Sequence, residues 1–231
     1  MTPLIVALDF PSASPAFELV QQLDPKKCRL KVGKELFTSA GPEFVTRVVE
    51  QGFDVFLDLK FHDIPSTVAK AVNAAAELGV WMVNVHASGG PDMIAAAREV
   101  LEGRSGRIPT LIAVTVLTST SPEVLRIMGV SRSLEEQVLL LARIAKESGA
   151  DGVVCSALEA GEIKRECGES FATVTPGIRP AGSELDDQHR VMTPAEAVAA
   201  GSDYLVVGRP ITKAAEPMAV VTGILDHLSS A

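Results

Sequence analysis

Eight short runs of β-forming residues alternate with amphipathic, helix-forming stretches along the whole chain. The pattern predicts strands at 4–10, 28–33, 54–60, 82–87, 110–117, 152–157, 172–175 and 204–208. It predicts helices after them at 16–23, 42–51, 67–78, 91–101, 134–147, 158–166, 193–199 and 218–228. Eight strand–helix pairs in a chain of 231 residues are what a (β/α)8 TIM barrel requires.

A doubly wound open sheet is the alternative architecture for alternating strands and helices. The first expected strand, however, is not followed by G-x-G-x-x-G, and the chain has no P-loop. No change of composition and no Pro/Gly/Ser-rich linker marks a second domain. We therefore predict one α/β unit, a single TIM-barrel catalytic domain over residues 1–231.

Local signals mark several helix ends. Ser14-Pro15 and Thr193-Pro194 are typical of helix starts, since a hydroxyl residue caps the first turn and proline suits it. Glycines lie where helices are expected to end, a position that favours a left-handed backbone: Gly52, Gly79, Gly149 and Gly201.

The strand expected at 54–60 carries a D-x-K-x-x-D motif that runs from Asp58 to Asp63. Side chains alternate between the faces of a strand, so Asp58 and Lys60 share one face while the opposite face is wholly apolar. A structural ion pair would explain the spacing of Asp58 and Lys60 alone. The full motif, however, lies where a parallel strand meets its loop, the usual place for active sites in α/β folds. We interpret it as catalytic.

Other polar residues fall at the ends of expected strands, which share one mouth in a barrel. Barrel phosphate sites commonly use the loops after the seventh and eighth strands, where Arg179 and Gly208-Arg209 occur. The polar segment 179–190 is either a solvated loop or a lid that closes on the phosphate, with Gln188 donating from its tip. The remaining candidates at strand ends or on strands are Asp9, Lys31 and Thr118.

The overall charge limits the partners. With 29 acidic and 21 basic residues the net charge is −8, which argues against nucleic acid and anionic membranes but leaves a small anionic substrate open. The three cysteines show no metal-ligand spacing and are expected to be thiols in a reducing compartment. No signal peptide or membrane-spanning run is recognisable, so we expect a cytoplasmic protein.

Over nearly its whole length the chain resembles the bacterial type of orotidine 5′-phosphate decarboxylase. The resemblance rests on an ordered set of motifs: ALDF, LKVGKELF, DLKFHDIPST, VNVHASGG, TVLTS, PGIRP and VGRPIT. D-x-K-x-x-D alone fits the wider decarboxylase superfamily, whereas the ordered set is much narrower. This resemblance implies the same barrel and a lyase that converts orotidine 5′-phosphate to uridine 5′-phosphate and CO2 in pyrimidine biosynthesis.

The resemblance also implies roles for individual residues. Lys31, Asp58, Lys60 and Asp63 would form the catalytic network, with Lys60 as the proton donor and no metal or organic cofactor. Asp63 and Thr67 would complete the site of the partner subunit in a homodimer. The substrate-binding residues implied are Asp9 for the ribose, Thr118 for the pyrimidine, and Arg179, Gln188, Gly208 and Arg209 for the phosphate.

Two rival functions stay open. Metal-dependent sugar-phosphate decarboxylases or aldolases of the same superfamily carry, by resemblance, an acidic metal ligand where this chain has Lys31. An ammonium there would repel Mg²⁺. A non-catalytic barrel that binds a phosphate ligand is expected to lack Lys60 or an aspartate of the motif, and this chain has them all.

Overall fold

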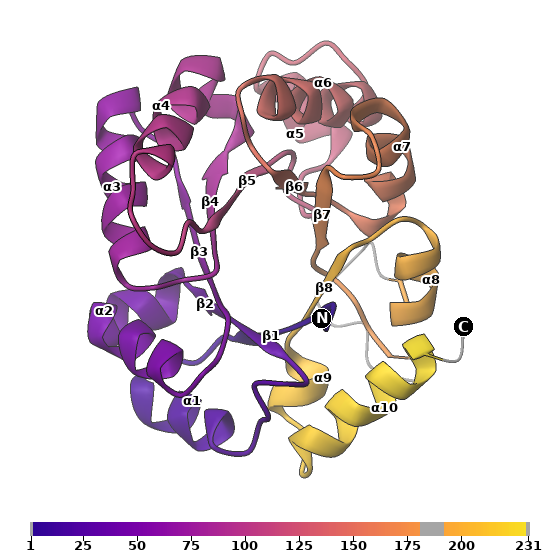
Figure 1. The fold of residues 1–231 in the computed structure, drawn as a ribbon. Helices are drawn as coiled ribbons and strands as arrows, with labels where there is room; N and C mark the ends of the chain where they lie inside the picture. The colour runs from indigo at the N-terminus through magenta and orange to yellow at the C-terminus, as the bar shows by residue number, and fades with distance from the viewer. Residues whose placement is uncertain (1, 181–191, 230–231) are drawn as a thin grey trace.

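The computed structural model describes residues 2–180 and 192–229. Its parallel strands pair in sequence order, and β1 pairs with β8, so the sheet closes into a barrel surrounded by helices (Figure 1). The predicted (β/α)8 TIM barrel is confirmed. The strands are β1 (Leu4–Leu8), β2 (Arg29–Gly33), β3 (Val55–Phe61), β4 (Met82–His86), β5 (Thr110–Val114), β6 (Gly152–Val154), β7 (Ala172–Thr175) and β8 (Tyr204–Val207).

The helices cover the outside of the barrel (Figure 1). In chain order they are α1 (Ala13–Val20), α2 (Lys34–Glu50), α3 (Pro65–Glu77), the 3-10 turn η1 (Ala87–Gly89), α4 (Pro91–Glu102), α5 (Pro122–Ile127), α6 (Leu134–Glu147), α7 (Ala157–Cys167), α8 (Pro194–Ala199), α9 (Arg209–Thr212) and α10 (Pro217–Ser229). Among the described residues, no helix is both long and apolar enough to cross a membrane.

Alternation along the strands separates two apolar cores. One lies between the sheet and the helices and includes Val55 and Leu57 of β3. The other fills the barrel interior and consists of Ile5, Ala7, Phe56, Met82, Ile112, Val174 and Val206. Phe56 therefore points inward, and the same alternation directs Asp58 toward the interior at the carboxyl end of β3.

Several element boundaries differ from the sequence predictions. Helix α1 begins at Ala13 after Ser12, so Ser14-Pro15 lies within its first turn instead of at its start. Helix α2 begins at Lys34, well before 42, and Gly41 interrupts it with a φ of 72° that the sequence pattern did not reveal. Strand β5 ends at Val114, earlier than expected.

Two short helices, α5 and α9, were not predicted at all. Both are too short for a recognisable helical period of apolar residues. The glycines expected after helices are confirmed by positive φ values of 77° to 102°: Gly52, Gly79, Gly149 and Gly201. Thr193 also caps α8 as expected, since its hydroxyl accepts from the Glu196 backbone N–H.

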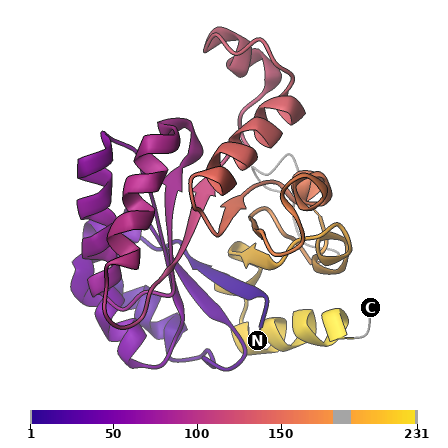
Figure 2. The same cartoon turned by 45° about the horizontal axis from the view of Figure 1, so that its top comes forward.

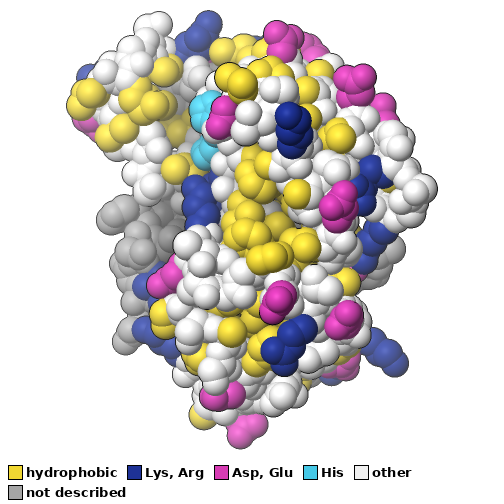
Figure 3. Space-filling view, turned by 90° about the vertical axis from the view of Figure 1, so that its left-hand side faces the viewer, with side chains coloured by type: hydrophobic (Ala, Val, Ile, Leu, Met, Phe, Trp, Pro, Cys, Tyr) yellow, Lys and Arg dark blue, Asp and Glu magenta, His cyan; other side chains and the backbone are white. Residues whose placement is uncertain are grey.

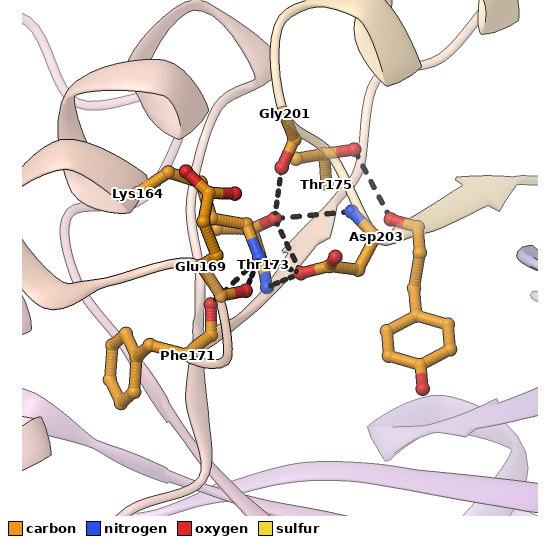
Figure 4. A network of polar contacts seen from close by, with 8 residues as sticks. Lys164, Glu169, Phe171, Thr173, Thr175, Gly201 and Asp203 are labelled. Carbon is orange, nitrogen blue, oxygen red and sulfur yellow. Dashed lines mark hydrogen bonds and ion pairs between the residues drawn. The ribbon is translucent and has the colours of Figure 1, made fainter.

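A network of hydrogen bonds and an ion pair links two strands at the amino-terminal end of the barrel. Lys164 Nζ lies 2.6 Å from Asp203 Oδ2 and also donates to the carbonyls of Glu169 and Phe171 (Figure 4). The same Asp203 carboxylate accepts from the backbone N–H and the hydroxyl of Thr173. Since Thr173 is the second residue of β7 and Asp203 directly precedes β8, this network ties those strands together at the end opposite to their carboxyl termini.

Helix α5 and the adjoining end of α6 project beyond the barrel as an arm (Figure 2). The arm exposes three large apolar side chains, namely Val124 at 43%, Ile127 at 85% and Met128 at 70%. The space-filling view shows apolar side chains on this lobe and in a band over the face formed by α2 and α3 (Figure 3). Large apolar side chains that are exposed together in this way are a feature of interaction faces.

Candidate active site

Four charged side chains form a row across the carboxyl ends of β1, β2 and β3. Lys31 Nζ lies 3.1 Å from Asp9 Oδ1 and 3.4 Å from Asp58 Oδ2. Lys60 Nζ lies 2.6 Å from the other oxygen of the Asp58 carboxylate. The order of charges is therefore negative, positive, negative, positive, and each lysine contacts at least one carboxylate.

The centre of this row is largely withdrawn from solvent. Asp58 and Lys31 are only 9% and 8% exposed. Burial raises the pKa of Asp58, but the charges of Lys31 and Lys60 and the hydrogen bonds from Lys60 and Asn84 outweigh it, so the net pKa is lowered. Asp58 therefore stays ionised at neutral pH and offers fixed negative charge to both ammonium groups.

Two adjoining hollows open beside the charged row, and Lys31, Asp58, Pro176 and Val206 line both of them. The first encloses about 220 Å³ next to Lys60, and most of its wall is apolar: Phe56, Val114, Val116, Leu117, Val154, Cys155, Val174 and Val206. The second encloses about 550 Å³, and three cationic side chains line it besides Lys31: Arg179, Arg209 and Lys213.

The structure brings most of the predicted site residues to these hollows. Thr118 lies in the loop after β5 and lines the first hollow with Lys60. Asp9, Arg179, Gly208 and Arg209 line the second. Gln188 lies outside the described residues.

Asp63 and Thr67 line neither hollow of their own chain. Both are exposed, and Asp63 Oδ1 accepts from the Ile64 backbone N–H at 2.6 Å. The neighbouring Ile64 side chain is 64% exposed. Within one chain, the D-x-K-x-x-D motif thus divides into a buried pair, Asp58 and Lys60, and an outward-facing Asp63.

Sequence reasoning missed two polar residues of this region. Asn84 of β4 is fully buried, and its Nδ2 donates to Asp58 Oδ1 at 2.7 Å. The signal was available, because Asn84 is the one polar residue between Val83 and Val85 on an otherwise apolar part of the strand. Lys213 lines the second hollow four residues after Arg209, a spacing that helix α9 converts into a shared face.

The donor set does not favour a divalent metal. Among residues 2–180 and 192–229, no three His, Cys, Asp or Glu side chains are grouped so that they could hold a metal ion. Asp9 and Asp58, the carboxylates of the row, are separated by the Lys31 ammonium that contacts both.

Comparison with known proteins identifies the family of this barrel. Residues 2–224 match the family model described as the orotidine 5′-phosphate decarboxylase / HUMPS family. The chain belongs to this family. A curated orotidine 5′-phosphate decarboxylase of Shewanella sediminis is 59% identical over 227 residues, which are 98% of this chain and 97% of the relative. That of Saccharophagus degradans is 59% identical over 228 residues, or 99% and 95% of the two chains.

A solved structure supports the same placement within the decarboxylase / HUMPS family. The orotidine 5′-phosphate decarboxylase of Lactobacillus acidophilus superposes with a TM-score of 0.88 at 42% identity, with 98% of each chain covered. The resemblance inferred from the sequence motifs is thus confirmed at the level of family and fold.

Proposed function

We propose that this chain decarboxylates orotidine 5′-phosphate to uridine 5′-phosphate and CO2, in the biosynthesis of pyrimidines. Curated relatives that span nearly the whole chain carry the name of this enzyme. The observation that carries the proposal is the row of charges from Asp9 to Lys60, which is buried at its centre, Lys31 and Asp58, and lies between an apolar hollow and a cationic one. This arrangement suits a flat ring at one end and a phosphate at the other.

The reaction demands fixed positive charge at one atom. Breaking the bond between C6 and the carboxylate leaves the electron pair on C6, in the plane of the ring, where no π system delocalises it. The proposed reaction uses no cofactor as an electron sink, so the protein must stabilise that pair electrostatically. Lys60 lines the apolar hollow, and in the proposed mechanism its ammonium transfers one proton to C6 as CO2 departs.

Asp58 places a negative charge beside this proton donor and orients it. Desolvation alone disfavours a lysine ammonium, and a carboxylate 2.6 Å away opposes that effect. The Lys31 ammonium lies 3.4 Å from the other oxygen of Asp58, so the three side chains hold one another in place. The rate enhancement required is roughly 20 kcal/mol or more in activation free energy, beyond what any single group supplies.

Remote binding energy must therefore contribute. In this proposal Arg179, Arg209 and the Gly208 backbone hold the phosphate, with Lys213 added from the structure. Asp9 binds the ribose hydroxyls and Thr118 an edge of the pyrimidine. Gln188 remains a proposed phosphate ligand from the segment that follows Arg179.

The proposal includes a homodimer in which Asp63 and Thr67 serve the partner's site. Both side chains are exposed and line neither hollow of their own barrel. Exposed Ile64 beside Asp63, and the apolar side chains of the arm, provide surface that a second copy could cover. Residues 1–231 act in this proposal as one catalytic domain, and the cytoplasm is its compartment because the three buried cysteines are free thiols.

One assay separates this function from its rivals. Purified protein with orotidine 5′-phosphate and excess EDTA should lose the pyrimidine absorbance of the substrate and produce uridine 5′-phosphate. The metal-dependent sugar-phosphate enzymes that share this superfamily would stop in the chelator. A barrel that only binds the ligand would retain it unchanged, and an unchanged spectrum with saturating substrate would overturn the proposal.

A further inference from the structure

The backbone of β3 is irregular where it carries the charged pair. Leu57 pairs with Val83 of β4, but the next pair joins Phe61 to Val85. The chain thus advances from 57 to 61 on β3 while it advances only from 83 to 85 on β4, so Asp58, Leu59 and Lys60 all lie opposite Asn84. This is a β-bulge, a device that redirects side chains next to functional sites.

The bulge places Lys60 in an unusual backbone conformation. Its φ is +54°, and among the described residues it is the only non-glycine residue with a positive φ. A residue with a Cβ avoids this left-handed region unless its surroundings hold it there. Such strain persists only where neighbouring contacts determine the conformation.

The side chain of Asn84 provides those contacts. Asn84 Oδ1 accepts from the backbone N–H of Lys60 at 2.8 Å, and Asn84 Nδ2 donates to Asp58 Oδ1 at 2.7 Å. The amide can have only this orientation, because a backbone N–H is always a donor and an ionised carboxylate is always an acceptor. With 0% exposure, Asn84 has no water to replace either partner.

The same Asp58 oxygen also accepts from Lys60 Nζ at 2.6 Å. One buried amide therefore fixes Lys60 at its backbone and, through Asp58, at its ammonium. Asn84 does not line either hollow, so it has no direct contact with a substrate bound there.

We propose that Asn84 is a positioning residue that holds the bulged Lys60 backbone and the Asp58 carboxylate, and thereby aims the Lys60 ammonium into the apolar hollow. The inference rests on the proposed decarboxylase function and deepens it. Because Asn84 acts on the proton donor and not on the phosphate or ribose contacts, its loss should lower kcat and leave substrate binding largely intact.

Three variants test the proposal. Asn84→Ala removes both hydrogen bonds and should lower kcat by at least about 100-fold, with KM and the Kd for uridine 5′-phosphate within about threefold of wild type. Thr173→Val is the matched control: Thr173 is a buried strand residue with side-chain hydrogen bonds that lines neither hollow, and its loss should lower Tm without lowering kcat.

Asn84→Asp tests the pH dependence of kcat, which should not change if Asn84 only stabilises the fold. An ionised Asp at 84 repels Asp58 and cannot donate to it, whereas a protonated Asp can both donate and accept, as the amide does. Burial and the neighbouring carboxylate raise the pKa of such a group. The ratio of kcat for Asn84→Asp to that for wild type should therefore rise as the pH is lowered.

Nuclear magnetic resonance of protein labelled with ¹⁵N-lysine tests the positioning role without measuring turnover. The chemical shift of the Lys60 ammonium should change in Asn84→Ala and remain unchanged in Thr173→Val. An unchanged signal, or a kcat within threefold of wild type for Asn84→Ala, would overturn the positioning role. An inactive wild-type protein would instead overturn the proposed function, while the Lys60 signal would still decide the role of Asn84.

Discussion

A β-carbon on Gly33 would lie 3.2 Å from Lys31 Nζ and 3.5 Å from Asp9 Oδ1. The first distance is tighter than ordinary van der Waals contact, and the atom it meets is held between two carboxylates. Gly33 has a φ of −91°, so the left-handed freedom of glycine is not what the position requires. Its role is to leave space for the ammonium at the centre of the charged row.

Gly33→Ala should therefore disturb the site and not the fold. The added methyl group pushes the Lys31 ammonium off its bridging position, and we expect kcat/KM to fall by about tenfold, or about 1.4 kcal/mol. Gly103→Ala is the matched control, because a β-carbon there would lie 3.7 Å from the nearest atom at a φ of −73°. Steady-state kinetics and thermal unfolding of both variants provide the check, and identical kinetics in the two would contradict this role for Gly33.

Arg209→Ala tests the cationic hollow. Its proposed contact with the phosphate is remote from the bond that breaks, so kcat/KM for orotidine 5′-phosphate should fall steeply while the slow reaction of orotidine, which lacks the phosphate, should barely change. Arg126→Ala, at an exposed arginine on the arm, is the control and should leave both reactions unaltered. An equal loss with both substrates would mean that Arg209 does not act by binding phosphate.

His86 should make the stability of the fold depend on pH, in a direction that follows from its pKa. Burial lowers its pKa most, the positive charges of His62, Lys34 and Lys60 lower it further, and Asp58 partly offsets them. The imidazole therefore takes up its proton at a lower pH in the folded chain than in the unfolded chain, where the pKa is near 6.5. Below that pH the unfolded state binds more protons, so stability is lost as the pH falls.

We expect His86→Gln to reduce this loss. Urea unfolding at pH 8 and pH 5.5 should give a smaller difference in the free energy of unfolding for the variant than for wild type. His227→Gln, at an exposed position on α10, should keep the wild-type difference. If His86→Gln also keeps it, protonation of another group governs the acid sensitivity.

The barrel was predictable because the periodicity of apolar residues and the positions of glycines indicate local structure, and the folded barrel keeps that local structure. Lys31 illustrates this: it was a candidate because it lies on an expected strand, and the structure places it on β2, where it contacts Asp9 and Asp58. The motif from Asp58 to Asp63 likewise located the site at the end of β3.

The irregular features escaped prediction because they depend on contacts between distant segments. The bulge at Lys60 is defined by pairing with β4 and by the amide of Asn84, which follows it by 24 residues. The break at Gly41 and the short helix α5 have no period that could indicate them. The resemblance assigns Asp63 to the site of a partner subunit, and in this chain Asp58 lines the hollows whereas Asp63 lines neither, so its role stays a prediction.

The outward direction of Asp63 leads to the test of a shared site. If Asp63 completes the partner's site, Lys60→Ala and Asp63→Ala homodimers should both be nearly inactive, for different reasons. Exchange of subunits between them creates hybrids with two unlike sites. One site carries both defects, while the other combines Lys60 from one chain with Asp63 from its partner and is intact.

Random pairing makes about half of the dimers hybrids, each with one intact site of two, so activity should return to roughly a quarter of wild type in a closed two-fold dimer. Native mass spectrometry of one isotope-labelled variant verifies that exchange has occurred. Mixing Lys60→Ala with Lys60→Ala, Gly103→Ala is the control and should restore nothing, because every site then lacks the proton donor. If exchange is complete and the first mixture is as inactive as its parents, Asp63 does not serve the partner, and the shared-site model is wrong.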